Sequence, residues 1–383
     1  MNRNKLTKRF LLLSAALTMA LGQSAFAGET VALNLDDAML RAFQTNPTVS
    51  IAQYELDSAR ASYNAARQSR GISISANHTT QRGGYDDAQQ AAPGIWTKGI
   101  GNNHANSLNA SLPIFTGGKL SGTIKQAKAN YQYNEVGVQR TYNEMRSTVT
   151  DGYFNMLQAD NIQKLSAESV TRLEDHLKNV QAQYDVGVVA KVDVLRSQVE
   201  LANAKQTLIQ AENAYQVAEA NMNKIVGLPM DTNLKLDNLL VYNAYDKNMD
   251  DCLAYAAEHR PELMQAKYGV DAAKGALMVA RSGHMPQVAA SATQQWSDSS
   301  WPGDDNGKWG VGVNVSMNVF DTGVTLSKIH GAEADLKKAE ETYRNTVDSV
   351  NLDVRSNYLG LREAEKRIST TKLAVEQADE DYR

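Results

Sequence analysis

The sequence contains little of what stabilises small, cross-linked domains. Of its 383 residues, only one is a cysteine (Cys252), 7 are prolines and 7% are aromatic. A single cysteine cannot form a disulfide within the chain, so disulfides cannot define this fold. The formal net charge is -4 and no basic cluster occurs, which argues against nucleic acid as a partner.

Motifs for catalysis, cofactor binding and metal binding are missing as well. The sequence has neither a P-loop nor a G-x-S-x-G segment, and its histidines are scattered without ligand spacing. The acidic pairs at 36–37 and 250–251 could be read as catalytic. Both pairs stand at expected helix starts, however, where aspartate caps a helix. We therefore expect no enzymatic activity, no cofactor and no metal site.

Long apolar runs are limited to the N-terminus. The run from Phe10 to Leu21 follows four basic residues and precedes Ala25-Phe26-Ala27, which is the order of a cleavable secretory signal peptide. We expect removal of residues 1–27 and a mature chain that begins near Gly28, with no cysteine there to carry a lipid anchor. A retained membrane anchor is the weaker alternative, because the run is shorter than the ~20 apolar residues that a spanning helix needs.

The mature sequence carries one plan twice. Without gaps, the segment from Leu35 aligns with the segment from Met249, and a second frame aligns Phe115 onward with Phe320 onward. Matched pairs include Asp36 with Asp250, Asp37 with Asp251, Pro47 with Pro261, Tyr54 with Tyr268, Gly118 with Gly323 and Tyr153 with Tyr358. We therefore expect two repeats, 28–248 and 249–383. The second is expected to lack its final helix, because Arg383 aligns with Lys178 whereas the first copy continues to about Gly227.

Each repeat is predicted to contain a helix, two strands and a second helix. The strands are recognised by strict alternation of apolar with small or polar residues, clearest from Trp309 to Phe320 and repeated at 72–77, 108–114 and 288–293. The strands that contain these segments are expected to be about 10 residues long, which suits a tilted strand that crosses a bilayer. Segments 82–105 and 297–307 are rich in Gly, Asp, Asn and Gln, so we expect exposed hairpin loops there.

The two faces of these strands suit a membrane pore. One face is small or polar and almost uncharged, as a wet lumen requires, and the other is apolar, as lipid requires. Four strands cannot close a barrel, so their outer edges must pair with other copies, and three copies would supply about 12 strands. Aromatic residues near the strand ends are typical of a membrane girdle: Tyr85, Trp96, Trp296, Trp301 and Trp309. The alternative is a pair of ordinary hairpins on a soluble core.

A helical hairpin is predicted after the first strand pair. Leu120 to Tyr184 contains no proline and shows coiled-coil-like spacing, so it predicts a rod of about 100 Å that projects into the periplasm. Gly187 can end this helix in the left-handed conformation, and Asp193 can stabilise the start of the returning helix. The turn presents Val186, Val188 and Val189, which either form a docking surface or pack beneath their own turn.

These motifs together resemble the TolC family of efflux channels. The segments that carry the resemblance are Val186-Gly187-Val188-Val189-Ala190 with Asp193, the strand exits Phe115-Thr116-Gly117-Gly118 and Phe320-Asp321-Thr322-Gly323, and the duplicated Asp-Asp openings. The resemblance implies a homotrimer with a 12-stranded barrel in outer-membrane lipid and a periplasmic α-helical tunnel. It also implies that the tip from Val186 to Asp193 contacts a periplasmic adaptor (membrane fusion) protein, which acts with an inner-membrane pump or ABC exporter. The gating residues would lie beyond Arg383.

The sequence therefore predicts a membrane α/β protein that acts as a passive outer-membrane conduit in tripartite efflux or type I secretion. The alternative is a periplasmic coiled-coil scaffold or interaction protein without a pore, which would not need lipid-facing strands. The cargo is not specified, because the residues of the expected lumen are generic.

Overall fold

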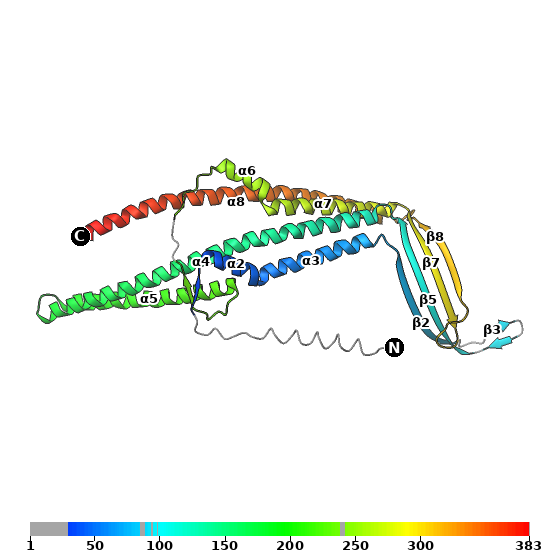
Figure 1. Ribbon diagram of the computed structural model, residues 1–383, viewed down its shortest axis with the longest axis horizontal. Helices are drawn as coiled ribbons and strands as arrows, with labels where there is room; N and C mark the ends of the chain where they lie inside the picture. Colours follow the sequence, from blue (N-terminus) through cyan, green and yellow to red (C-terminus); the bar gives the residue numbers. More distant parts are fainter. Residues whose placement is uncertain (1–29, 85–88, 93–94, 98, 238–241, 383) are drawn as a thin grey trace, which may run out of the picture. The chain divides into compact units, whose positions relative to one another are not determined.

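The computed structural model describes residues 30–84, 89–92, 95–97, 99–237 and 242–382. The predicted signal peptide, 1–27, lies outside these residues, as do Tyr85 and the side chain of Trp96. The chain forms two compact units, one from residues up to 50 with 141–243 and one from 51–140 with 244–383. These units are defined by packing contacts. Their boundaries differ from those of the two repeats that internal sequence similarity predicts. The elements are shown in Figure 1.

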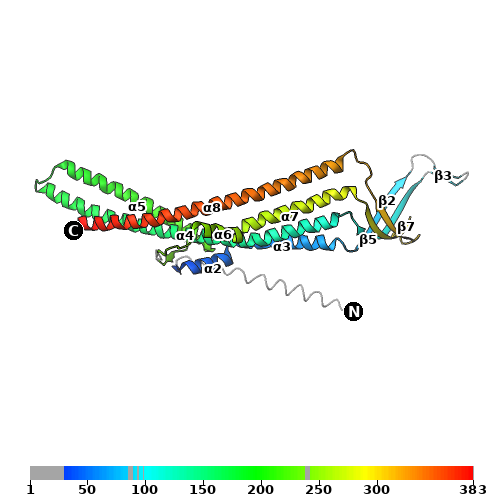
Figure 2. The ribbon, with the colours of Figure 1, turned by 90° about the horizontal axis from the view of Figure 1, so that it is seen from above.

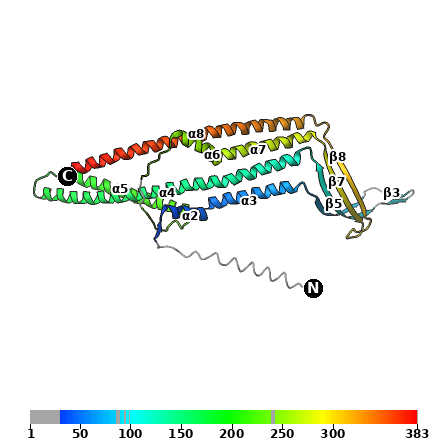
Figure 3. The same cartoon turned by 45° about the horizontal axis from the view of Figure 1, so that its top comes forward.

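The first unit is built around a helical hairpin and a small two-stranded sheet. Its elements are β1 (Val31–Leu33), α2 (Leu35–Thr45), the latter part of α4 (Lys119–Asp185), α5 (Lys191–Val226) and β6 (Leu234–Leu236). The chain turns back after α4 so that α5 runs beside it (Figure 3). Strand β1 pairs in parallel with β6. The predicted uninterrupted helix from 120 to 184 is confirmed by α4.

The core of the first unit forms where α2, α4 and α5 meet the small sheet. Val149 and Tyr153 of α4 are fully buried, together with Ala42 of α2 and Met222 of α5. The Tyr153 hydroxyl donates to the carbonyl of Asp237 at 2.8 Å. A buried hydroxyl needs such a partner, because an unpaired polar group loses its hydrogen bonds to water. Tyr153 thereby ties the long helix to the chain that follows β6.

The second unit contains a four-stranded antiparallel sheet in the order β2-β5-β7-β8 (Figure 1). Its strands are β2 (Ser73–Gly84), β5 (Ile100–Phe115), β7 (Gln287–Asp298) and β8 (Lys308–Ser316). A separate short hairpin joins β3 (Gln89–Ala92) to β4 (Ile95–Thr97). The central β5–β7 pair joins the two hairpins, so β2 and β8 are left as edges.

The second unit also contains helices. They are α3 (Pro47–Gln68), the first part of α4, α6 (Met249–His259), α7 (Pro261–Arg281) with a short 3-10 turn (Ser282–His284), and α8 (Val324–Tyr382). Of these, α3, α4, α7 and α8 are connected to the sheet, and α6 is a short helix before α7. Helices α7 and α8 run side by side (Figure 2). None of the described helices is both long enough and apolar enough to cross a membrane.

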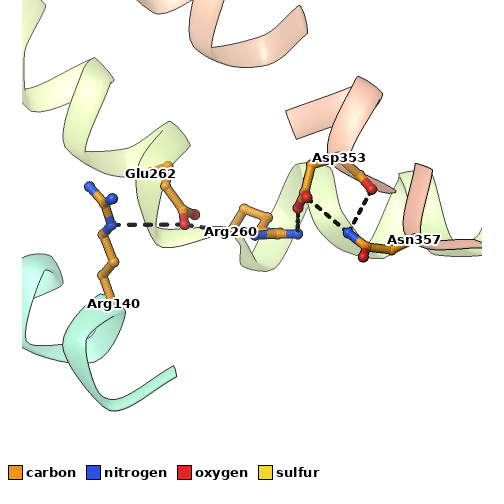
Figure 4. Close-up of polar contacts among 5 residues, drawn as sticks. All are labelled: Arg140, Arg260, Glu262, Asp353 and Asn357. Atoms are coloured by element: carbon orange, nitrogen blue, oxygen red, sulfur yellow. Dashed lines mark hydrogen bonds and ion pairs between the residues drawn. The ribbon is translucent and has the colours of Figure 1, made fainter. Parts of the chain in front are cut away.

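A polar cluster joins three helices of the second unit (Figure 4). Arg260, which precedes α7, forms an ion pair with Asp353 of α8 and lies 3.7 Å from a carboxylate oxygen of Glu262. The same oxygen of Glu262 lies 4.0 Å from Nε of Arg140 on α4, and the Asn357 amide donates to the Asp353 carboxylate at 2.8 Å. We call these five residues the polar clamp. It links the start of α7 to the first half of α4 and to the middle of α8.

Two sequence-based expectations are corrected. The helix caps are Asn34 and Asn248, whose side chains accept from the backbone N–H of Asp37 and Asp251 at 2.7 and 2.8 Å. The aspartates instead occupy the first turn, where their negative charge interacts favourably with the positive end of the helix dipole. The predicted loop 82–105 was too long, since β2 and β5 remain paired as far as Gly84 opposite Ile100. Backbone hydrogen bonding extends the hairpin beyond the apolar segment that revealed it.

Candidate conduit wall and hairpin tip

The strand register sorts the sheet into two faces. Residues directly opposite each other in paired strands point to the same side, so each row across the sheet belongs to one face. One row consists of Ile74, Ala110, Ala292 and Val311, and another joins Leu112, Ala290 and Val313. The predicted apolar face is therefore continuous across strands from both halves of the sequence.

The opposite face is polar and small. Its rows are Ser73, Ser111, Ser291 and Gly312, then Ser75, Asn109, Thr293 and Gly310, then Asn77, Ser107, Gln295 and Lys308. Apart from Lys308, these rows consist of hydroxyl, amide and glycine positions, which make a hydrophilic wall. We call this surface the polar wall.

No described residue covers the valines that β8 contributes to the apolar face. Val313 is 64% exposed and Val311 and Val315 are similarly open. Trp309 and Trp301 are exposed near the loop between β7 and β8, at the position that an aromatic girdle requires. A soluble protein rarely leaves so large a contiguous apolar patch exposed. This exposure argues against ordinary hairpins on a soluble core.

Near this loop the apolar face gives way to a hydrogen-bonded chain of polar side chains. Asn106 donates to the carbonyls of Pro302 and Gly303, both at 2.9 Å, and its carbonyl oxygen lies 2.8 Å from Nδ1 of His78. His78 contacts Thr80, which contacts His104, each at 2.9 Å. The chain attaches the loop to β2 and β5.

Both strand-to-helix junctions contain two consecutive residues with positive φ. These are Gly117 and Gly118 before α4, with φ of 60° and 95°, and Thr322 and Gly323 before α8, with φ of 55° and 88°. Glycine adopts this conformation without strain. At Gly117 a Cβ atom would also collide with the side chain of Met285. The preceding Phe115 and Phe320 are exposed.

A side chain caps the helix at each junction. The Thr116 hydroxyl accepts from the backbone N–H of Leu120 at 3.2 Å, and the Asp321 carboxylate accepts from that of Thr325 at 2.8 Å. The Thr325 hydroxyl and backbone N–H, together with the N–H of Gly323, lower the pKa of Asp321. Asp321 therefore stays ionised at neutral pH, as a cap at the positive end of α8 should.

The hairpin tip of the first unit has the geometry that its sequence predicts. Gly187 has φ of 83°, and the N–H of Val188 donates to the Gln183 carbonyl at 2.8 Å, so α4 ends in a Schellman motif. The Asp193 carboxylate accepts from the N–H of Ala190 at 3.1 Å, just before α5 begins. These two hydrogen bonds fix the reversal of the chain.

The tip presents apolar side chains. Val186 is 74% exposed and Val188 is 72% exposed, while Val189 is half-buried. The hypothesis that these valines pack beneath their own turn is therefore wrong for Val186 and Val188. Their exposure leaves an apolar surface at the end of the hairpin.

Among its described residues, the first unit has two further surfaces that are not covered. A groove of about 890 Å³ lies among α4, α5 and the start of α3, and Gly152, Ala214 and Ala218 are among its lining residues. An apolar stripe along α5 is exposed, and it consists of Val192, Leu195, Val199, Ile209 and Val217. Small residues in a groove allow another helix to approach closely, and an apolar stripe favours such contact.

Sequence reasoning missed the polar clamp and the close contact between Gly122 of α4 and Gly275 of α7, where a Cβ atom on Gly275 would lie 2.9 Å from the Gly122 carbonyl oxygen. Neither has a local signal, because its residues come from helices far apart in sequence. It also did not single out Lys308 on the polar wall, although continuing the alternation one residue before Trp309 would have found it. In the described part of the chain, no three residues of the metal-ligating types gather in a possible site.

The helical hairpins and the two-faced sheet together define the fold of outer-membrane channel proteins. The structure superposes on the outer membrane protein VceC of Vibrio cholerae with a TM-score of 0.74 and 16% identity, over 90% of this chain and 83% of that one. It superposes on CusC, whose structures concern transmembrane channel formation, with a TM-score of 0.71 and 17% identity, over 88% and 77% of the two chains. At these identities the likeness concerns the fold.

Sequence similarity supplies the family. The family described as outer membrane efflux protein matches residues 39–228 and 253–383, and the chain belongs to that family. Outer membrane protein TolC of Escherichia coli (strain K12) is 24% identical over 380 residues, which cover 94% of this chain and 74% of that relative. The family, the outer-membrane location and the general role in efflux that the sequence predicts are thereby confirmed. The relatives are channel and efflux proteins rather than enzymes.

Proposed function

We propose that the protein is a passive conduit, closed as a 12-stranded barrel by three copies of the chain and served by an inner-membrane pump or exporter and a periplasmic adaptor. The observation that carries this proposal is the sheet, which has a continuous apolar face and a polar wall on which Lys308 is the one charged strand residue. Such a sheet lowers the barrier to polar solutes because it replaces hydrocarbon with a wet surface. No chemical step is required of the protein, since the pump supplies the energy.

The unpaired edges support assembly from several copies. Strands β2 and β8 each have one free side, and backbone groups left unpaired in hydrocarbon cost several kcal/mol each. Closure by other copies removes these edges. The groove of the first unit and the apolar stripe on α5 supply further surfaces that a second copy can cover.

The hairpin tip is proposed as the adaptor contact. Its candidate residues are Val186, Gly187, Val188, Val189, Ala190 and Asp193. Exposed valines on a backbone fixed by Gly187 and Asp193 offer a preorganised apolar surface, which reduces the entropy lost on docking. Replacing Val186 and Val188 with serine should weaken co-purification with the adaptor while leaving the oligomer intact.

The two repeats, 28–248 and 249–383, also remain a proposal. Their matching junctions support it, because Phe115–Gly118 and Phe320–Gly323 share two residues with positive φ and a capping side chain ahead of a long helix. In this view α2–α3–β2–β5–α4 corresponds to α6–α7–β7–β8–α8, and the junctions are equivalent exits from the barrel.

Conductance across a planar bilayer tests the conduit directly. We expect stepwise channels from the detergent-extracted protein, with a uniform unit size. No channels from a protein that stays soluble without detergent would contradict the conduit and favour the periplasmic scaffold.

Two neighbouring residues provide a matched test of the faces. Val313 lies on the apolar face and Asn314 lies on the polar wall. Val313→Lys should reduce the heat-resistant oligomer in outer membranes, because a lysine facing mid-bilayer lipid costs about 2–4 kcal/mol. Asn314→Lys should be tolerated. Equal tolerance of both changes would contradict lipid contact on the apolar face.

A further inference from the structure

The sheet carries very few charged side chains. Among the residues of its four strands, the charged types Asp, Glu, Lys and Arg occur only as Arg82, Asp298 and Lys308. Arg82 lies an even number of positions after Ile74 in β2, so both side chains are on the same face. Asp298 pairs with His104, which is on that face as well. Arg82 and Asp298 therefore belong to the apolar face, near the loop end.

Lys308 is the exception, because it stands on the polar wall. It pairs with Gln295, in the row that also contains Ser107 and Asn77. The pairing of β7 with β8 has no register shift between this row and Gln287, so the assignment to a face does not depend on a bulge. The polar wall thus has one charged position in each chain, directly after the loop that joins β7 to β8.

The surroundings of Lys308 leave its charge open to solvent. Lys308 is exposed. The next two residues on the same face of β8 are Gly310 and Gly312, which have no side chains that could cover Lys308. No acidic side chain in the described residues forms an ion pair with Lys308. A solvated ammonium group on an otherwise uncharged wall dominates the local potential.

We propose that Lys308 sets the charge preference of the pore at its loop end, favouring small anions and anionic solutes over cations. This inference rests on the proposed function, since one lysine from each copy forms a ring only in a closed assembly. Rings of lysine or arginine favour anions in pores. Their reach is set by screening, which is ~10 Å at 0.1 M salt and ~3 Å at 1 M. The preference should therefore weaken as salt rises.

The test compares ion selectivity of purified channels in planar bilayers under a tenfold KCl gradient. Lys308→Gln should lower the chloride-to-potassium permeability ratio by roughly twofold at low salt, and Lys308→Glu should lower it further. Lys308→Arg keeps the charge and should keep the ratio, which separates loss of charge from loss of structure. Arg82→Gln is the matched control, because it removes the same charge from the other face and should not change selectivity.

The outcomes distinguish this inference from the function on which it rests. Channels whose ratio is the same in the unmodified, Lys308→Gln and Lys308→Glu proteins would overturn the role of Lys308 and leave the conduit standing. An equal change in Arg82→Gln would overturn it too, because the effect would not depend on the face. A complete lack of channels from the unmodified protein would overturn both.

Discussion

Helices α4 and α7 of the second unit lie in close contact at Gly122 and Gly275. A Cβ atom on Gly275 would lie 2.7 Å from the backbone nitrogen of Gln126 and 2.9 Å from the carbonyl oxygen of Gly122. Both neighbours are backbone atoms, so no side-chain rotation can relieve the overlap. The two helices can pack this closely only without side chains at this point. A single sequence does not reveal that requirement, because glycine within a helix can have other causes.

Gly275→Ala should therefore force α4 and α7 apart and destabilise the protein by about 1–3 kcal/mol. Gly269→Ala is the control on the same helix, since a Cβ there meets no atom within 4 Å. That change should be neutral or stabilising by up to ~1 kcal/mol, because alanine is the better helix former. The thermal midpoints of the two variants in detergent measure the difference. Equal midpoints would contradict the close contact.

Tyr153 gives a prediction for alkaline pH. Burial, reinforced by the nearby Asp237 carboxylate, raises the pKa of Tyr153 above its ordinary value of 10.0. The unfolded chain then releases this proton at lower pH than the folded chain, so stability should fall as pH rises above about 10. Tyr153→Phe should lose about 1 kcal/mol at neutral pH with the hydrogen bond to Asp237, and should show a shallower alkaline decline.

Unfolding midpoints between neutral pH and strongly alkaline pH would check this prediction. Tyr54→Phe is the control, because Tyr54 is 71% exposed and its removal should leave the profile unchanged. An alkaline decline of equal steepness in Tyr153→Phe and the unmodified protein would exclude Tyr153 as a cause.

At the scale of single elements, the sequence predicted periodic features better than their ends. Alternation located the strands and assigned Val313 and Asn314 to opposite faces, because side-chain direction in a strand follows directly from residue number. The long helix α4 was also predicted within a residue or two of its ends. The hairpin β2–β5 was predicted too short, since its outer pairing depends on backbone hydrogen bonds that polar residues also make. The capping asparagines were missed because aspartates stand beside them.

The polar clamp depends on how elements pack, and it could not be predicted for that reason. Arg260 and Asp353 are about a third to a half exposed, at 36% and 47% of their side-chain surface. A double-mutant cycle with Arg260→Ala and Asp353→Ala should give a coupling energy of no more than about 1 kcal/mol, which decreases with added salt. Arg367 with Glu363 is a comparison pair within α8 and should give a few tenths of a kcal/mol. A coupling above about 2 kcal/mol would show that the clamp is more than a surface ion pair.

At the scale of the whole molecule, the proposed barrel would make association a condition of membrane insertion. A chain with free edges at β2 and β8 would expose unpaired backbone to lipid, so the stable membrane form should contain a closed set of strands. Chemical cross-linking of the extracted protein should give a ladder that stops at three chains. Two differently tagged copies made in one cell should co-purify. A monomer that persists in lipid would contradict this prediction.

The free edges of β2 and β8 also determine whether a mutation is expected to be dominant or recessive. In a closed barrel each edge strand pairs with an edge strand of a neighbouring chain. One chain with a defective β8 would therefore prevent closure of the barrel that it joins. In a cell that produces wild-type and defective chains in equal amounts, only about one trimer in eight would contain three wild-type chains. Mutations that prevent pairing of an edge strand but leave the rest of the fold intact should therefore behave as dominant alleles. A deleted gene copy, which contributes no chain, should be recessive.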